Sequence, residues 1–309
     1  MGYVFASLFA FLAPFAVKDC ACWGSTTMGA RRRSPIRDLL PPLLLLAGLA
    51  GVWQVATWAL AVPKWILPSP AQIARALAST WQLLLWHSAQ TALETALGLA
   101  LALAAGVGLA VAIDLSPTLR RTLYPLLVAS QTVPIMALAP LLIIWFGYGT
   151  ASKAVVVALV CFFPLAVATA DGLRAADPDL LGLLRSMGAT RRQVFLKVRL
   201  PGALPGFFSG LRIAITYSVV GAVIGEWVGA GRGLGVYMIR ASNSYLTDRV
   251  FAAIAVTSLL SIALFLAVGA VERLALPWYY TAARQEQWEE IAQTVADSAQ
   301  GALATGERR

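Results

Sequence analysis

The chain has 309 residues, of which 59% are hydrophobic and only 13% are charged, and its mean hydropathy is +0.73. Soluble proteins carry about 25% charged residues, so this chain has too little polar surface to wrap soluble domains of its length. These values exclude a soluble protein and indicate a polytopic membrane protein. In a membrane protein, basic residues in cytoplasmic loops set the orientation of the helices, and this explains a net charge of +9. We therefore expect no nucleic-acid partner.

Residues 1–38 are predicted to form a cytoplasmic N-terminal segment. Residues 3–17 are apolar but too short to cross a bilayer, and they lack the basic start and cleavage site of a signal peptide. Met28, followed by Gly-Ala-Arg-Arg-Arg, resembles a natural start of a membrane protein. Two interpretations therefore stay open for residues 1–27: a gene-start artefact, or a segment at the membrane interface.

The rest of the chain contains six long apolar segments. Each has about the 20 residues that a transmembrane helix needs, and backbone groups in lipid must be satisfied within the segment, which favours helices. The third segment contains three prolines and is expected to be kinked or broken. We predict an all-α membrane protein with a transmembrane domain over 39–275 and a cytoplasmic C-terminal tail over 276–309. The six segments are roughly 39–62, 89–113, 122–146, 153–172, 205–226 and 250–271.

The distribution of basic residues predicts the orientation of these helices. Most arginines fall on the side that holds the N-terminal segment, including the run Arg31 to Arg33 and the pair Arg191 and Arg192. Cytoplasmic loops of membrane proteins carry an excess of Lys and Arg. With an even number of spans, both termini are expected in the cytoplasm.

The most informative stretch is the loop over 174–204, between the fourth and fifth segments. Asp177 is a good N-cap with Pro178 at the first helical position, and Gly188 is suited to close the helix. Thr190 and Gln193 read as a capping box that starts a second short helix, which we expect Pro201 to end. The loop therefore holds two capped helices, which a plain linker does not need.

The first of these helices carries an apolar stripe. Its members follow a helical spacing and are Leu180, Leu183, Leu184 and Met187. The stripe has two possible roles: packing against the protein's own spans, or docking into a groove on a cytoplasmic partner.

The same loop resembles the cytoplasmic coupling loop of permease subunits in binding-protein-dependent ABC importers. Their pattern is Glu-Ala-Ala, three residues, Gly, nine residues, Ile, one residue and Leu-Pro. The chain matches it at Gly188, Val198, Leu200 and Pro201 but has Gly182-Leu183-Leu184 in place of the opening triplet. This departure puts a Glu-mediated contact with the ATPase in doubt, although not the placement of the helix.

Further resemblance covers about residues 60–275. The shared motifs are LPSP from Leu67, PIMALAPLLIIWFG from Pro134, GLRIA from Gly210, GEW from Gly225 and GLG from Gly233. They are similar to motifs in nitrate, sulfonate and taurine importer permeases. The variant TYSVVGAVIGEW from Thr216 looks closest to permeases for thiamine pyrimidine precursors or riboflavin.

The resemblance implies a type I ABC importer permease in a bacterial-type inner membrane. It implies a second permease copy, two ATPase subunits that bind ATP, and an external substrate-binding protein. It also implies that the chain is no enzyme and holds no cofactor or metal. Its docking residues would be the stripe together with Asp177, Gly188 and Pro201.

The residues themselves agree with a subunit that performs no chemistry. None of the four lysines follows a glycine, so no phosphate-binding loop of the GxxxxGK[ST] type exists. A self-sufficient secondary transporter remains the alternative, although few central charges are available for an ion relay. A membrane enzyme or scaffold is less favoured, because no catalytic constellation is present.

Ionisable residues within spans are costly and each needs a role. Glu226 is expected to contact the substrate path or outer gate, or to be a satisfied interfacial carboxylate paired with Arg232. Glu94 is expected to be structural or to line the gate. His87, beside Trp86, is expected to be interfacial rather than a ligand.

Overall fold

The computed structural model describes residues 35–279, and the positions of side chains from residue 40 onward. The chain divides into two units, one of residues 1–49 and 278–309 and the other of Ala50–Pro277. The second unit holds all the features discussed below. The segment 1–27, the tail from 280 and both termini lie outside the described residues, so the domain boundaries stay a prediction.

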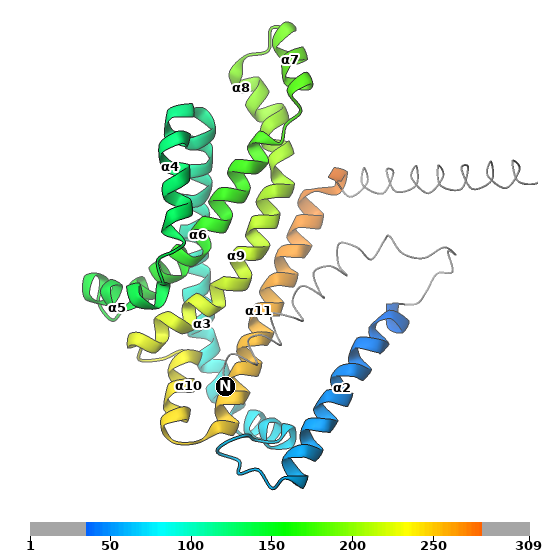
Figure 1. Ribbon diagram of the computed structural model, residues 1–309, viewed down its shortest axis with the longest axis vertical. Helices are drawn as coiled ribbons and strands as arrows, with labels where there is room; N and C mark the ends of the chain where they lie inside the picture. The colour runs from blue at the N-terminus through cyan, green and yellow to red at the C-terminus, as the bar shows by residue number, and fades with distance from the viewer. Residues whose placement is uncertain (1–34, 280–309) are drawn as a thin grey trace, which may run out of the picture. The chain divides into compact units, whose positions relative to one another are not determined.

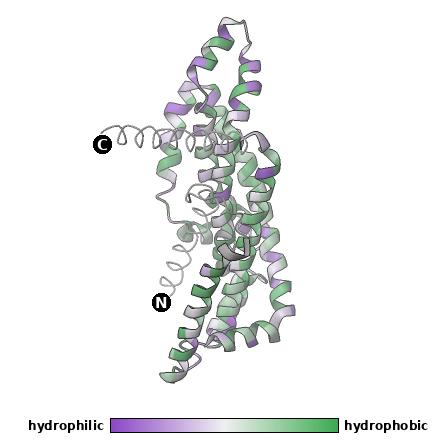
Figure 2. Ribbon diagram, turned by 90° about the vertical axis from the view of Figure 1, so that its right-hand side faces the viewer, coloured by the Kyte–Doolittle hydropathy of each residue, from purple (hydrophilic) through white to green (hydrophobic). Residues whose placement is uncertain are grey.

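Every regular element between residues 35 and 279 is helical, which confirms the all-α prediction (Figure 1). The long elements are α2 (Pro35–Ala59), α3 (Pro70–Leu115), α6 (Thr150–Arg174), α9 (Leu200–Gly229) and α11 (Thr247–Ala275). Five helical stretches are long and apolar enough to cross a membrane, and a bent pair of helices makes up to six. Figure 2 shows hydrophobic residues dominating these long helices.

The third predicted segment is broken, as its prolines indicated. It forms α4 (Pro117–Ser130) and α5 (Ile135–Phe146), which are bent by 101° relative to each other. Pro134 lies in extended backbone at the start of α5, and a proline lacks the amide that a continuous helix would need there.

The second segment is longer than predicted, because α3 begins at Pro70 rather than near residue 89. Ser69 caps this helix in a capping box with Gln72. Thr80 has non-helical dihedrals, so α3 is kinked there. The predicted segment began only after Trp81–His87 and so left out the first part of α3.

The core of the second unit is the packing of α6 against α3 and α9. Small residues allow these helices to approach closely: a Cβ on Gly98 would lie 2.4 Å from the Cβ of Val157, and one on Gly210 would lie 2.9 Å from the carbonyl oxygen of Pro164. Small residues at interfaces serve the same purpose in membrane helices generally, because apolar area alone does not drive association in lipid.

Candidate functional site

The loop between α6 and α9 forms the two predicted short helices. The first is α7 (Pro178–Ser186), and the Asp177 carboxylate accepts a hydrogen bond of 2.8 Å from the backbone amide of Asp179. Gly188 closes the helix with φ +79°. Its amide donates to the carbonyl of Arg185, and the amide of Ala189 donates to that of Leu184. This pair of bonds is a Schellman motif, which requires the left-handed backbone that glycine adopts without strain.

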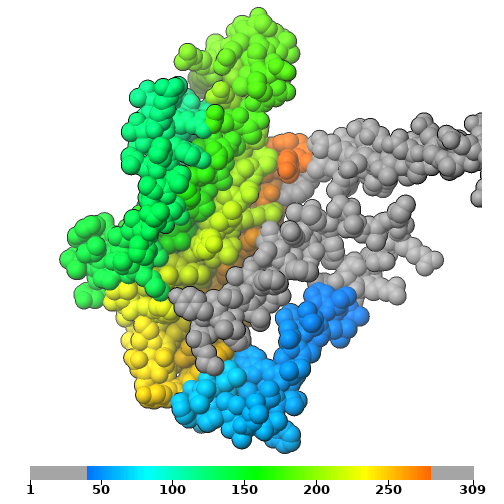
Figure 3. Space-filling view, viewed as in Figure 1, coloured from blue at the N-terminus to red at the C-terminus, as the bar shows by residue number. Residues whose placement is uncertain are grey.

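The apolar stripe of α7 faces away from the rest of the chain. Leu180, Leu183 and Met187 are 42%, 57% and 74% exposed, and Leu184 is half-buried. Of the nine residues of α7, none is buried. Figure 3 shows the light-green tip of α7 and α8 standing clear of the ends of α4 and α6. Packing against the protein's own spans therefore leaves most of the stripe uncovered.

The second short helix begins as predicted but does not end at Pro201. The Thr190–Gln193 capping box starts α8 (Arg191–Val194), which continues through a π-helical turn, η1 (Phe195–Arg199), into α9. Pro201 is the second residue of α9. The prediction was wrong because the wider π turn before Pro201 lets the helix continue past a residue that has no amide to donate.

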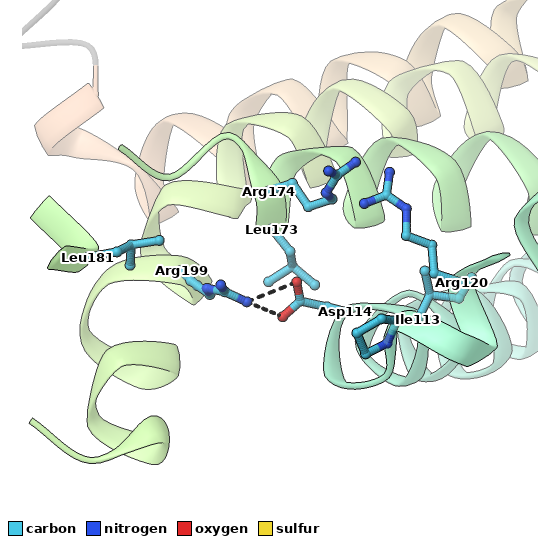
Figure 4. A pocket seen from close by; sticks show the side chains of 8 residues that line it. Ile113, Asp114, Arg120, Leu173, Arg174, Leu181 and Arg199 are labelled. Atoms are coloured by element: carbon cyan, nitrogen blue, oxygen red, sulfur yellow. Dashed lines mark hydrogen bonds and ion pairs between the residues drawn. The ribbon is translucent and has the colours of Figure 1, made fainter. Parts of the chain in front are cut away.

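An ion pair ties this turn to the end of α3. The Arg199 guanidinium contacts both carboxylate oxygens of Asp114, at 2.9 and 3.1 Å, and the Asp114 side chain is only 4% exposed (Figure 4). Both bonds come from one nitrogen, Nη1, and each is charge-assisted, which makes it stronger than a bond between neutral groups. The position of the loop relative to the spans is therefore set by a specific contact.

A second cluster lies inside the helices, where α3 and α9 bring the predicted pair of glutamates together. Glu94 is 0% and Glu226 1% exposed, and both accept hydrogen bonds of 2.7 Å from neighbouring residues of α3, Glu94 from Gln90 and Glu226 from Thr91. The Nζ atom of Lys153 in α6 lies 3.7 Å from the nearer oxygen of Glu94. Buried charges are tolerated when they are paired in this way.

The same cluster holds the start of α10 (Leu234–Asn243). Three consecutive amides at its N-terminus donate to side chains: Gly233 to Nδ1 of His87 at 3.0 Å, Leu234 to Thr91 at 2.9 Å, and Gly235 to Glu226. Thr91 in turn donates to Glu226 at 2.7 Å. The free amides of a helix N-terminus favour a carboxylate, so Glu226 serves as a distant cap for α10.

Two expectations about neighbouring residues need correction. Arg232 does not pair with Glu226: its Nε atom donates to Gln90 at 2.8 Å, and its guanidinium lies 5.3 Å from the centre of the Trp86 ring. His87 is 3% exposed and accepts a backbone amide, so its ring is enclosed by the protein and not exposed at the surface. Spacing along one helix does not reveal that the loop after α9 folds back onto α3.

Lys153 was missed as a member of the cluster. It follows a Gly-Tyr-Gly turn and reads as a loop residue, yet it is 4% exposed within α6. A signal was available, because a lysine at the edge of an apolar segment and an unexplained glutamate in another are natural partners. Whether Glu94 and Glu226 also contact a transported substrate stays a prediction.

Together, the long apolar helices and the protruding helix α7 define a helical membrane protein. The chain belongs to the family described as "Binding-protein-dependent transport system inner membrane component", which matches residues 98–276. It is an ABC importer permease of the type I family, a transport component and not an enzyme. Family membership favours this interpretation over a self-sufficient secondary transporter.

Relatives of known name support the same conclusion. The chain is 41% identical to a probable ABC transporter permease protein of Haemophilus influenzae over 74% of this chain and 94% of that protein. It is 40% identical to the formylaminopyrimidine transport permease protein of Halalkalibacterium halodurans, over 77% and 96%. It is 35% identical to the taurine transport system permease protein of Escherichia coli, over 74% and 85%.

The fold also resembles that of a solved structure. The MetNI methionine ABC transporter, in an inward-facing conformation, has a chain that superposes with a TM-score of 0.57 and 21% identity. The match covers 63% of this chain and 97% of that one. This likeness supports the arrangement of helices and says nothing about the substrate.

Proposed function

We propose that this chain forms the translocation path of an ATP-driven importer and that α7 is the helix through which a partner ATPase drives it. The observation that carries the proposal is the exposed stripe of Leu180, Leu183 and Met187 on a helix capped at both ends. Short helices present spaced apolar anchors of this kind to grooves on partner proteins. The cap residues Asp177 and Gly188 hold the helix ready for docking before the partner arrives.

The departure from the family's opening triplet refines this proposal. Gly182-Leu183-Leu184 places two leucines where the family pattern has Ala-Ala, and no carboxylate where it has Glu. Docking of this loop would then depend on apolar burial more than on an ion pair. Because salt screens exposed charges and not apolar contacts, we expect the complex with the ATPase to survive high ionic strength.

The proposed mechanism is alternating access at the interface of two permease copies. ATP, bound by two ATPase subunits, closes the ATPase pair and moves the two docked α7 helices together, so the spans open toward a loaded external binding protein. Hydrolysis and release reverse the motion and free the substrate inward. The coupling requires that the docked helix makes different contacts in the inward-open and outward-open states. A contact that is equally strong in both states does not change the equilibrium between them.

The proposed assembly is a homodimer with both termini in the cytoplasm of a bacterial inner membrane. The single set of spans and the single docking loop in this chain motivate two copies for two ATPases. Native mass spectrometry of the purified complex should give two copies of this chain per two ATPases. A complex with one copy and a different permease subunit would show that the partner is a heterologous one.

For the substrate we propose a small organic nutrient, with a thiamine pyrimidine precursor or a riboflavin-like compound ahead of taurine or a sulfonate. The motif from Thr216 and the relative named for formylaminopyrimidine transport support this order. The test is a thermal-shift screen of the external binding protein that co-purifies with this permease. Stabilisation by nitrate alone would make an organic substrate the wrong choice.

The docking role is tested by Leu183→Asp, with Ser186→Asp as the matched control. Both side chains are exposed on α7, so neither change disturbs the core, but only Leu183 lies on the stripe. An aspartate in an apolar groove without a partner is strongly unfavourable. Leu183→Asp should abolish co-purification of the ATPase and uptake into vesicles, while Ser186→Asp keeps both. If both variants retain the ATPase and transport normally, α7 is not the docking helix.

A further inference from the structure

A pocket of about 240 Å³ lies where α3 and α6 end and α4 and the docking loop begin (Figure 4). Its lining includes three arginines and one aspartate: Arg120, Arg174, Arg199 and Asp114. The aspartate is already satisfied by the two bonds from Arg199. Neither Arg120 nor Arg174 forms an ion pair with a described side chain, and Arg120 lies 5.8 Å from the centre of the Tyr124 ring.

The local backbone brings one helix N-terminus to the pocket, beside the C-terminal ends of α3 and α6. Pro117, which also lines the pocket, is the first residue of α4, and Ser116 caps that helix. A helix N-terminus carries a partial positive charge, so α4 brings its favourable end for an anion to the same place as the arginines. Figure 4 shows Arg120 and Arg174 reaching toward the pocket from α4 and α6. The ligand that these groups fit is a small anion.

The position of the pocket along the spanning helices indicates where the anion comes from. Two helices long and apolar enough to span the membrane, Pro70–Leu115 and Thr150–Arg174, end at its wall. The pocket therefore lies at one end of these spanning helices, which is where a lipid headgroup could reach it. Its volume is below the 300–1,000 Å³ typical of pockets for whole small molecules, so a headgroup fits better than a nutrient. Basic pockets between transmembrane helices are recognised sites for anionic headgroups.

We propose that this pocket binds the phosphate headgroup of an anionic phospholipid and so fixes the root of the docking loop. Leu181 of α7 lines the pocket together with Arg174 of α6, so an occupant contacts both sides of the turn that carries Asp177. A bound headgroup would hold α7 in the position from which it meets the ATPase. This consequence rests on the proposed docking role, while the lipid site itself does not.

The test uses the purified permease–ATPase complex in nanodiscs of phosphatidylcholine with increasing phosphatidylglycerol. Native mass spectrometry after release into detergent counts the phosphatidylglycerol molecules retained on each permease copy. The variants are Arg120→Gln and Arg174→Gln, and Arg121→Gln is the matched control, since Arg121 is the exposed neighbour on α4 and does not line the pocket. Each pocket variant should bind phosphatidylglycerol about fivefold more weakly, and the control should bind it normally.

Three results would overturn the proposal. Equal lipid retention in all three variants would show that the arginines do not hold a headgroup. Complete displacement of the lipid by inorganic phosphate alone would show that the pocket takes free phosphate instead. Pocket variants that keep the lipid but lose the ATPase would show that these arginines contact the partner protein. Because lipid retention is counted without transport, it can be judged even if α7 proves not to be the docking helix.

Discussion

The Glu226 carboxylate at the end of α9 accepts a hydrogen bond from the backbone amide of Gly235 in the first turn of α10. The two helices are separated by a glycine-rich turn, and this bond closes it. A Cβ on Gly233 would overlap the Glu226 carboxylate, and one on Gly235 would lie 3.0 Å from its Oε2 atom. The GEW and GLG motifs thus meet in one contact, which explains Gly233 and Gly235 without reference to a substrate, whereas Gly225 packs against Lys153.

Removal of the Glu226 carboxylate should loosen α10. Glu226→Ala leaves the Gly235 amide without its acceptor, and an unsatisfied buried group costs about 1–3 kcal/mol. It also removes the shorter of the two bonds of the Thr91 hydroxyl, which keeps the His87 carbonyl at 3.3 Å. We expect faster hydrogen exchange over residues 233–238 and a lower melting temperature in detergent. Glu226→Gln, which keeps one acceptor oxygen, should recover part of both.

The control for this experiment is Asp171→Ala, which removes an exposed carboxylate outside the cluster. If Glu226 instead acted by contacting a substrate, Ala and Gln variants would lose uptake equally with no change in exchange at α10. That pattern would show that the capping interaction is not its main role.

A close helix approach predicts a sharp difference between two glycines of α3. Gly98→Val would place a side chain against Val157 and the Ala154 carbonyl, whereas around Gly108 there is no heavy atom within 4 Å of an added Cβ. Overpacking of this kind costs about 1–3 kcal/mol. Gly98→Val should therefore lower the melting temperature and the membrane yield, and Gly108→Val should leave both unchanged. Similar losses in the two variants would mean that α3 and α6 do not meet at Gly98.

Gly188 should be required for coupling and not for folding. A β-branched side chain at φ +79° costs about 1–2 kcal/mol, which would re-aim α7 without disturbing the spans. The Gly188→Val variant should insert into the membrane normally, but its rate of ATP hydrolysis should no longer depend on the binding protein and substrate. Gly182→Val, on the same loop with ordinary dihedrals and open space around it, is the control. If transport by Gly188→Val stays coupled to ATP hydrolysis, a residue with left-handed backbone is not required at this position.

The orientation can be checked with reporters fused after Arg309. The basic excess on the side of the docking loop predicts a cytoplasmic C-terminus. A green fluorescent protein fusion should be fluorescent, and an alkaline phosphatase fusion at the same position should be inactive. The opposite pair of results would invert the topology of the whole chain.

The helical class, the broken third span and the caps of α7 could be predicted because each depends on local chemistry. Proline lacks an amide, Asp177 is next to the amide it accepts from, and a glycine closes a helix over four or five residues. The polar cluster could not be predicted in the same way. His87, Lys153 and Arg232 come from three separate segments, and their partners are chosen by how α3, α6 and the turn after α9 meet in space.

The continuation of α8 through the π turn into α9 has a mechanical consequence. Arg191–Gly229 is a single helical stretch of 39 residues, which at 1.5 Å per residue is about 58 Å long. One end of the stretch lies beside α7. The other end carries Glu226, which is hydrogen-bonded to the first turn of α10. If the whole stretch tilted by about 5° about its docking end, α10 would move sideways by about 5 Å. The π turn and the prolines Pro201 and Pro205 are the points at which the stretch could bend instead.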